Sequence, residues 1–251
     1  MLVDIHAHLD DKKFENDIDA VIERAKKAGV KFIINNGLNS ESNRKTLEFA
    51  EKYSIVRPAL GLHPTELANF SEEKIAEEIG FIKNNRKKIV AVGEVGLDYY
   101  WIKDAEKRKF QKKVFEKFIG LASELEKPLI VHSRDAENDV IEILENTKAK
   151  VVLHVFGGSI EQIKLAEKRN YYFSIPPRIV FDRDFQALVK NVNISRLLTE
   201  TDSPYLAPVK GQRNEPAFVS ESARMITQIK ELEEEEVQNI IFKNYTDLFL
   251  Q

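Results

Sequence analysis

The stretch LVDIHAHL, residues 2–9, places two histidines one residue apart within a short apolar run. Leu, Val and Ile in such a run are typical of a buried parallel strand. Successive side chains of a strand point to opposite faces, so His6 and His8 share a face and Ala7 lies on the other. The stretch therefore predicts a buried strand that presents two imidazoles side by side.

Seven further apolar runs follow at similar intervals, and amphipathic helical patterns such as residues 17–29, 42–53 and 159–170 lie between them. Alternating strands and helices over 251 residues predict an α/β fold, a (β/α)8 TIM barrel that forms a single domain over residues 1–251. Two more helical patterns between residues 217 and 250 predict C-terminal helices. An open doubly wound sheet is the alternative, and the number of strands disfavours it. The seven runs are VKFIINNG (30–37), IVRPALGLHP (55–64), KIVAVGEVGLD (88–98), PLIVHSR (128–134), VVLHVFGG (151–158), YYFSIPP (171–177) and RLLTETDSP (196–204).

Composition excludes several classes of protein. The formal net charge of −3 argues against nonspecific coating of duplex nucleic acid, and the absence of cysteine excludes disulfides and thiolate metal sites. No apolar stretch is long enough to span a bilayer, and the N-terminus lacks the pattern of a secretory signal. We therefore expect a cytoplasmic protein, with no membrane association and no obligate protein partner.

Polar side chains gather at the ends of the predicted strands. The active site of a TIM barrel lies at the C-terminal ends of its strands, so these side chains are expected to converge. Every histidine of the chain lies at such an end, which random placement would not produce. The residues concerned are His6, His8, His63, Glu94, His132, His154 and Asp202.

This set exceeds the four ligands of one tetrahedral zinc ion, so we predict two divalent ions that share a carboxylate. Glu94 is the expected bridge, because its strand lies between the two groups of histidines. The first ion is assigned to His6, His8, Glu94 and Asp202, and the second to Glu94, His132 and His154. Nitrogen and oxygen ligands suit Zn, Mn, Co or Ni, whereas four imidazoles suit Mg less well. Histidines satisfied only by backbone and water are the alternative.

Several motifs of the chain resemble those of the TatD family of metal-dependent hydrolases, which lies within the amidohydrolase superfamily. The resemblance implies a TIM barrel with a divalent-metal site. It also implies a deoxyribonuclease that hydrolyses phosphodiester bonds, often exonucleolytically, with DNA as substrate, single-stranded or at 3′ ends. The motifs cover nearly the whole chain: DIHAHLD (4–10), GLHPTE (61–66), GEVGLDYY (93–100), VHSRDA (131–136), HVFGG (154–158), TETDSPYLAP (199–208) and RNEP (213–216).

The chain also departs from the family pattern. Thr65 replaces a common second histidine after the proline, and Val155 and Gly158 are substituted within the HCFSG motif. A glycine-rich segment is replaced by SIPPRIVF (174–181). None of these changes removes a proposed ligand. Glu94 stands where many amidohydrolase relatives carry a carboxylated lysine, which makes a lysine-bridged lactonase or triesterase a poorer match.

The chemistry suggests a role for each remaining candidate. We expect a metal-activated hydroxide to attack the phosphate ester, with Asp202 orienting that water or taking its proton and Glu200 supporting Asp202 from the same face. The resemblance implies that His63 contacts the substrate phosphate. Arg213 is expected to bind phosphate oxygens bidentately, with help from the Asn214 amide. The aromatic residues 99–101 either stack on a base or cap the barrel.

Two other functions remain open from the sequence. The first is an amidohydrolase-type hydrolase that cleaves a C–N or C–O bond in a small molecule, because the fold by itself does not select the reaction. The second is a non-catalytic barrel that binds metal or a partner. The complete ligand set disfavours this last alternative.

Overall fold

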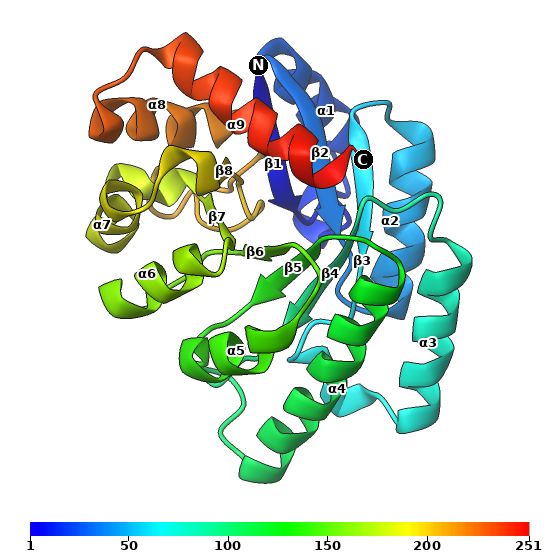
Figure 1. Cartoon of the computed structure of the whole chain (residues 1–251). Coiled ribbons are helices and arrows are strands. Elements are labelled where there is room, and N and C mark those ends of the chain that lie inside the picture. Colours follow the sequence, from blue (N-terminus) through cyan, green and yellow to red (C-terminus); the bar gives the residue numbers. More distant parts are fainter. Residues whose placement is uncertain (251) are drawn as a thin grey trace.

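Eight parallel strands form one sheet in the sequential order β1 to β8, and this sheet wraps into a barrel (Figure 1). The structure is a computed structural model that describes residues 1–250. Each of the eight predicted runs contains one strand, and most runs continue past it into the loop that carries the polar residues. The strands are β1 (Leu2–Ala7), β2 (Val30–Asn36), β3 (Val56–Leu60), β4 (Ala91–Gly96), β5 (Leu129–His132), β6 (Val151–Leu153), β7 (Tyr172–Ile175) and β8 (Leu197–Thr199).

A helix follows every strand, so the predicted (β/α)8 barrel is confirmed, and α9 is added at the C-terminal end. Ser71 and Ser159 cap the N-termini of α3 and α6, and the exposed glutamates 234–236 open α9. The helices are α1 (Ile18–Lys27), α2 (Ser40–Lys52), α3 (Glu72–Asn84), α4 (Ala105–Glu124), α5 (Glu137–Ile143), α6 (Ile160–Lys168), α7 (Arg183–Asn191), α8 (Val219–Lys230) and α9 (Glu234–Phe249).

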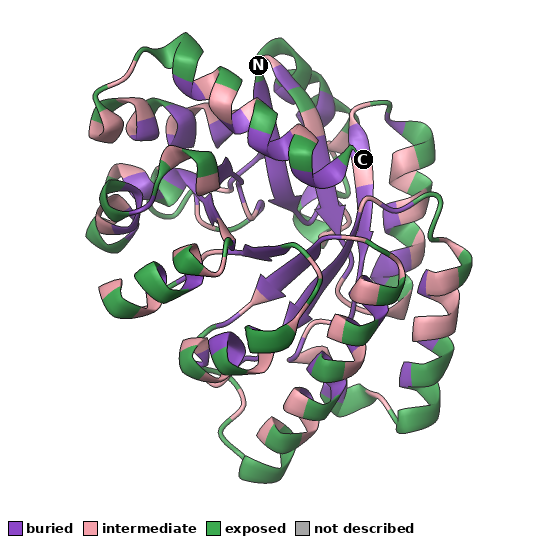
Figure 2. Cartoon of the chain, viewed as in Figure 1, coloured by how far each residue is buried: buried purple, intermediate pink, exposed green. Residues whose placement is uncertain are grey.

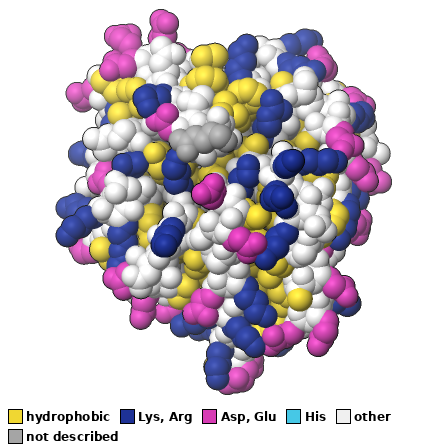
Figure 3. Space-filling view, turned by 45° about the vertical axis from the view of Figure 1, so that its right-hand side comes forward, with side chains coloured by type: hydrophobic (Ala, Val, Ile, Leu, Met, Phe, Trp, Pro, Cys, Tyr) yellow, Lys and Arg dark blue, Asp and Glu magenta, His cyan; other side chains and the backbone are white. Residues whose placement is uncertain are grey.

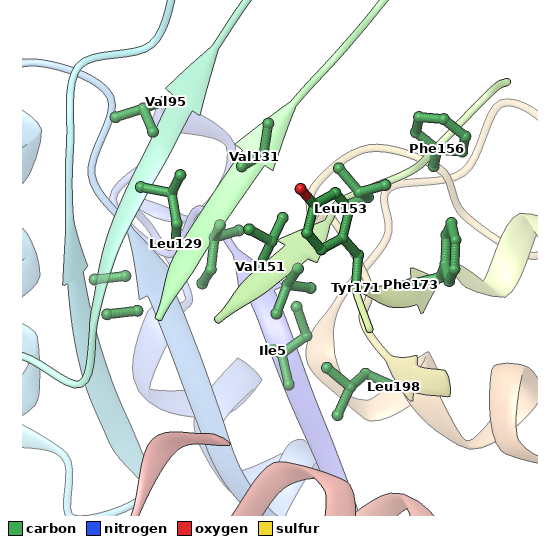
Figure 4. Packing of buried hydrophobic residues seen from close by; sticks show 14 of the residues in the cluster. Ile5, Val95, Leu129, Val131, Val151, Leu153, Phe156, Tyr171, Phe173 and Leu198 are labelled. Carbon is green, nitrogen blue, oxygen red and sulfur yellow. The ribbon is translucent and has the colours of Figure 1, made fainter. Parts of the chain in front are cut away.

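The strands form the buried interior, and the helices expose only their outer faces (Figure 2). All six residues of β1 and of β4 are buried, as expected for strands covered on both sides. Figure 4 shows the apolar packing from close by, with Leu129 and Val131 of β5 beside Val151 and Leu153 of β6. This rigid apolar interior supports the polar residues at the strand ends.

The barrel closes between its first and last strands. Thr199 of β8 donates a hydrogen bond from its hydroxyl to Val3 O, 2.6 Å away. Beyond β8, Asp202 N donates to His6 O at 2.7 Å and His8 N donates to Ser203 O at 2.8 Å. This closure brings the loop after β8, with Asp202, directly beside the two histidines of β1.

A glycine allows β4 and β5 to approach closely next to two candidate ligands. Gly96, the last residue of β4, has φ of 142°, and a Cβ atom there would lie 2.0 Å from His132 O. Only glycine tolerates both the dihedral angle and the close contact. The motif GEVG thereby places the end of β5 against the end of β4.

The surface carries charges of both signs. In Figure 3, lysines and arginines are interspersed with aspartates and glutamates across one face, and no histidine is visible there. Among residues 1–250, none of the helices combines the length and apolar character needed to cross a bilayer.

We predict that Tyr245→Phe stabilises the protein. Tyr245 of α9 is fully buried against Phe32 of β2, and its hydroxyl has no hydrogen-bond partner among the described residues. Because an unsatisfied buried hydroxyl costs about 1–3 kcal/mol, its removal should raise the free energy of unfolding by about 1 kcal/mol in urea denaturation.

Tyr171→Phe is the matched control, because the buried Tyr171 hydroxyl donates to Leu144 O at 2.7 Å. That variant should lose about 1 kcal/mol. If both variants lose stability equally, the Tyr245 hydroxyl is satisfied in solution and the prediction is wrong.

Candidate metal centre

A cavity of about 530 Å³ opens at the C-terminal ends of the strands, and the candidate ligands other than His6 line it. Its lining includes His8, His63, Glu94, Asp98, His132, His154 and Asp202. A second cavity of about 530 Å³ lies at the opposite end of the barrel, where Lys127, Pro128 and Lys150 line it. That second cavity contains no histidine, so the chemistry belongs to the first.

Glu94 occupies the centre of the cluster, buried on β4 with 1% of its surface exposed. Its Oε2 lies 3.1 Å from His6 Nε2 and 3.6 Å from His8 Nε2. Its Oε1 lies 2.8 Å from His132 Nδ1 and 3.7 Å from His154 Nε2. One carboxylate therefore turns an oxygen toward each group of histidines, which is the arrangement that a bridging ligand requires.

His6 and His8 turn their side chains to the same point, as their alternation on β1 predicts. Their Nε2 atoms are 3.3 Å apart, and Asp202 Oδ1 lies 3.9 Å from the first and 3.3 Å from the second. The other ring nitrogen of His8, Nδ1, lies 3.1 Å from Asn36 O. A carbonyl only accepts hydrogen bonds, so Nδ1 carries a proton and Nε2 is the nitrogen that a cation could reach once it is deprotonated.

Two acidic residues orient the imidazoles of His132 and His154 by hydrogen bonds to the ring nitrogens that point away from Glu94. Asp98 Oδ2 lies 2.9 Å from His132 Nε2, and Glu200 Oε2 lies 2.7 Å from His154 Nδ1. Each carboxylate holds the far nitrogen as a donor, so that the near nitrogen can face the centre. The sequence-based prediction missed Asp98, although its position two residues after β4, within GEVGLD, was a usable signal.

The position of Glu200 differs from the expectation that it supports Asp202. Its second oxygen, Oε1, accepts a hydrogen bond from Val155 N at 3.1 Å, and the side chain is fully buried. Both oxygens therefore face the loop after β6, and Glu200 acts on His154. Val155 has φ of 44°, an unfavourable region for a β-branched residue, and the hydrogen bond to Glu200 stabilises it there.

His63 lies three residues beyond β3 and joins the cluster on the side of His132. Its Nε2 lies 3.5 Å from Glu94 Oε1. Thr65 N donates to its Nδ1 at 3.3 Å, and the Thr65 hydroxyl lies 2.7 Å from the same atom. Since Nδ1 accepts, Nε2 carries the proton, and His63 presents a donor toward the cavity. Thr65, one of the departures from the family pattern, thus selects the tautomer of His63.

The structure does not bring Arg213 and Asn214 to the cavity, in contrast to the expectation. The Arg213 guanidinium pairs bidentately with Asp17 at 2.7 Å for both bonds and also donates to Lys13 O. Asn214 is fully buried and donates to Thr201 O at 2.7 Å. Their polar atoms are already used within the chain, so the RNEP segment holds the loop that carries Asp202.

The donor set fits divalent cations. Ligand atoms lie within 4.8 Å of one another in three overlapping groups: His6, His8 and Glu94; His6, His154 and Asp202; and His63, Glu94 and His132. His154 lies between the two ends, 3.7 Å from Glu94 and 4.0 Å from Asp202. Glu94 Oε1 is buried with no hydrogen bond of acceptable geometry among the described residues. Such an atom needs a positive partner.

Charge pairing within the cluster changes the pKa of most members. Burial opposes ionisation of Glu94 and Asp202, but the surrounding histidines outweigh burial and lower both pKa values below their usual range. Burial also opposes protonation of His8 and His154, yet Asp202 raises the pKa of His8 to about 9 and Glu200 raises that of His154 to about 10. In the absence of metal cations, protons on the histidines therefore balance the negative charge of the carboxylates.

A (β/α)8 barrel with a nitrogen and oxygen metal centre at its C-terminal strand ends is the architecture of metal-dependent hydrolases. The family model "TatD related DNase" matches residues 3–250. The chain belongs to the TatD family.

Relatives agree along the whole length. The uncharacterized metal-dependent hydrolase MJ1582 of Methanocaldococcus jannaschii is 40% identical over 98% of this chain and 96% of its own. The human deoxyribonuclease TATDN3 is 36% identical over 99% of this chain and 94% of its own. The crystal structure of YJJV, a TatD homologue from Escherichia coli K12, has a TM-score of 0.92 at 27% identity and covers 100% of this chain and 98% of its own.

We predict that Glu200→Gln lowers metal affinity about 10- to 100-fold, because the His154 imidazole loses its charged hydrogen-bond partner. Calorimetric titration with Zn or Mn measures the change. Glu235→Gln, a substitution on the exposed start of α9, is the control and should bind as wild type does. Unchanged affinity in Glu200→Gln, with the fold retained by circular dichroism, would show that His154 needs no such partner.

Metal affinity should rise with pH. At neutral pH the metal-free protein holds protons on His8 and His154, with pKa values of about 9 and 10, and a cation must displace them. The apparent association constant should therefore increase between pH 6 and 9, by about tenfold per pH unit for each proton released. Titrations in buffers of different ionisation enthalpy count these protons. An affinity independent of pH over this range contradicts the prediction.

Proposed function

We propose that this protein hydrolyses phosphodiester bonds of DNA at a centre of two divalent cations. The observation that carries the proposal is that the buried Glu94 carboxylate faces two groups of histidines. One of its oxygens faces His6 and His8, and the other faces His132 and His154. The printed name of the human relative, deoxyribonuclease, supports DNA as the substrate.

The distances support the ligand assignment. His6, His8 and Asp202 would hold one cation and His132 and His154 the other, with Glu94 shared. Bound divalent cations lower the pKa of a coordinated water and stabilise charge on the transferring phosphoryl group. The ligand chemistry, with four imidazoles and no sulfur, favours Zn, Mn, Co or Ni over Mg.

Asp202 is the candidate to position the attacking water. Its side chain keeps 15% of its surface exposed at the cavity, whereas the Glu94 side chain keeps 2%. The histidines around Asp202 lower its pKa, so it is ionised at neutral pH. An ionised carboxylate with a low pKa is a weak base, so orientation of the water is its larger contribution. Glu200 contributes by fixing the His154 ring.

His63 is the candidate donor to the substrate phosphate. Its Nδ1 accepts from Thr65, and burial lowers its pKa to about 3, so the ring stays neutral with a proton on Nε2. A neutral N–H donor in this position binds a phosphate oxygen without competing for a cation. His63 thus keeps the phosphate contact that the resemblance implies for it, and Arg213 and Asn214, which bond within the chain, do not share it.

The substrate is proposed to be a single strand or a 3′ end. The cavity of about 530 Å³ admits a nucleotide but not an intact duplex. An unpaired terminus enters such a site without strand separation.

The test is cleavage of end-labelled single-stranded DNA by protein reconstituted with Mn or Zn. Asp202→Asn and His132→Ala should each lose about 100-fold or more in kcat/KM, because each removes a proposed ligand. Asp184→Asn, an exposed substitution at the start of α7, is the matched control and should retain wild-type activity.

Equal cleavage by wild type and His132→Ala would identify a contaminating nuclease and defeat the proposal. A wild-type protein that binds metal, leaves DNA intact and hydrolyses an amide or lactone would instead establish the small-molecule alternative.

A further inference from the structure

Two adjacent aromatic side chains are left exposed beside the cavity. Tyr100 and Trp101 follow β4 and keep 42% and 64% of their surfaces exposed. Trp101 and Arg134 line the same cavity as Glu94 and His132. We refer to Tyr100, Trp101 and Arg134 as the aromatic rim. Side chains that merely cap a barrel are covered by their neighbours, whereas these two rings face solvent.

The positively charged side chain of Arg134, which has no acidic partner among the described residues, completes the rim. The Arg134 guanidinium lies 3.8 Å from the centroid of the Tyr100 ring and 5.8 Å from that of Trp101. Within the described residues 1–250, this guanidinium forms no ion pair and no hydrogen bond, unlike that of Arg213. The rim therefore presents planar apolar faces together with an unneutralised positive charge.

The backbone beneath the rim is held firmly. Asp98 accepts a hydrogen bond from Trp101 N at 2.7 Å through Oδ1, while its Oδ2 holds His132. Arg108 donates to Ile102 O at 2.7 Å and to Tyr99 O at 3.0 Å. One carboxylate thus fixes both a candidate metal ligand and the start of the rim. Exposed rings on a fixed backbone lose little freedom when a ligand binds.

We infer that the aromatic rim binds an unpaired nucleobase of the strand whose phosphate lies at the metal centre, an inference that rests on the proposed function. The base stacks on Trp101 or Tyr100, and Arg134 contacts a flanking phosphate. Every base offers a flat face and every linkage a negative charge, so this recognition tolerates any sequence. A base within a duplex already has both faces covered, so the rim selects single-stranded DNA or frayed ends.

The small size and the composition of the rim argue against a protein partner at this site. A stable protein interface needs roughly 800 Å² on each side, with a contiguous apolar core. Two rings and one arginine beside a cavity lined by charged groups do not supply such a patch. They do match the alternation of apolar base and anionic phosphate along a single strand.

Trp101 is the only tryptophan in the chain, so its fluorescence reports on the rim directly. The metal-loaded protein is titrated with a phosphorothioate dT6, which resists hydrolysis. We expect quenching by dT6 and none by a hexamer of the same phosphates that carries tetrahydrofuran in place of the nucleosides. Equal quenching by the base-free hexamer, or by a blunt duplex, overturns the inference.

Variants test the rim independently of its fluorescence. Trp101→Ala should weaken binding of labelled dT6 about 10- to 100-fold by anisotropy and raise KM more than it lowers kcat, whereas Trp101→Phe should retain most of the affinity. Arg134→Ala should reduce both affinity and its dependence on salt. Arg196→Ala is the matched control, because Arg196 lies over Tyr172 at the opposite end of the barrel.

The outcomes separate this inference from the proposed function. If Trp101→Ala binds the phosphorothioate dT6 and cleaves unmodified dT6 as wild type does, the rim has no such role although the nuclease assignment stands. If the wild type does not cleave unmodified dT6, yet the phosphorothioate dT6 quenches Trp101 and the base-free hexamer does not, the rim binds bases and the nuclease assignment fails. Calorimetry should give wild-type metal affinity for Trp101→Ala.

Discussion

The burial of one carboxylate among imidazoles governs this structure. Glu94 lies in the barrel with 1% of its surface exposed, and an isolated ionised group at that depth would be strongly unfavourable. Histidines from β1, β5 and the loops after β3 and β6 surround it, and together they outweigh burial and lower its pKa well below the usual range. The cluster needs positive charge, which either protons or divalent cations supply. The arrangement of the candidate ligands and of their hydrogen-bonded partners is consistent with that requirement.

A layer of acceptors around the cluster decides which nitrogen faces inward in three of the rings. Asn36 O acts on His8, Asp98 on His132 and Glu200 on His154. These partners come from three different elements, so the barrel as a whole sets the tautomers. Such partners commonly influence metal affinity as much as the geometry of the ligands does.

Several motif residues turn out to hold the loop after β8 in place. Asp4 is fully buried, and it accepts hydrogen bonds from Thr201 N, the Thr201 hydroxyl and His6 N. Burial raises the pKa of Asp4 to about 8. The side-chain amide of Asn214 donates a hydrogen bond to the backbone carbonyl oxygen of Thr201. Asp202 follows Thr201 directly, so its position depends on both contacts.

The architecture and the convergence of the candidate ligands were predictable from the amino-acid sequence alone. The spacing of eight apolar runs predicts the barrel, because each run forms a buried strand with a helix after it. The alternation of His6 and His8 puts both rings on one face, since that property is local to a strand. The placement of Glu94, His132, His154 and Asp202 at strand ends then implies convergence, because a parallel barrel gathers those ends at one rim.

The partners of individual side chains, in contrast, depend on how distant segments fold together. Glu200 alternates with Asp202 along the chain, yet its carboxylate reaches His154 across the barrel. Arg213 has the right chemistry for phosphate, but Asp17 of a distant segment neutralises it. Arg134, without an acidic partner in residues 1–250, lies beside the cavity instead. Ion pairs between remote segments depend on how the loops pack, and no local pattern in the sequence encodes that packing.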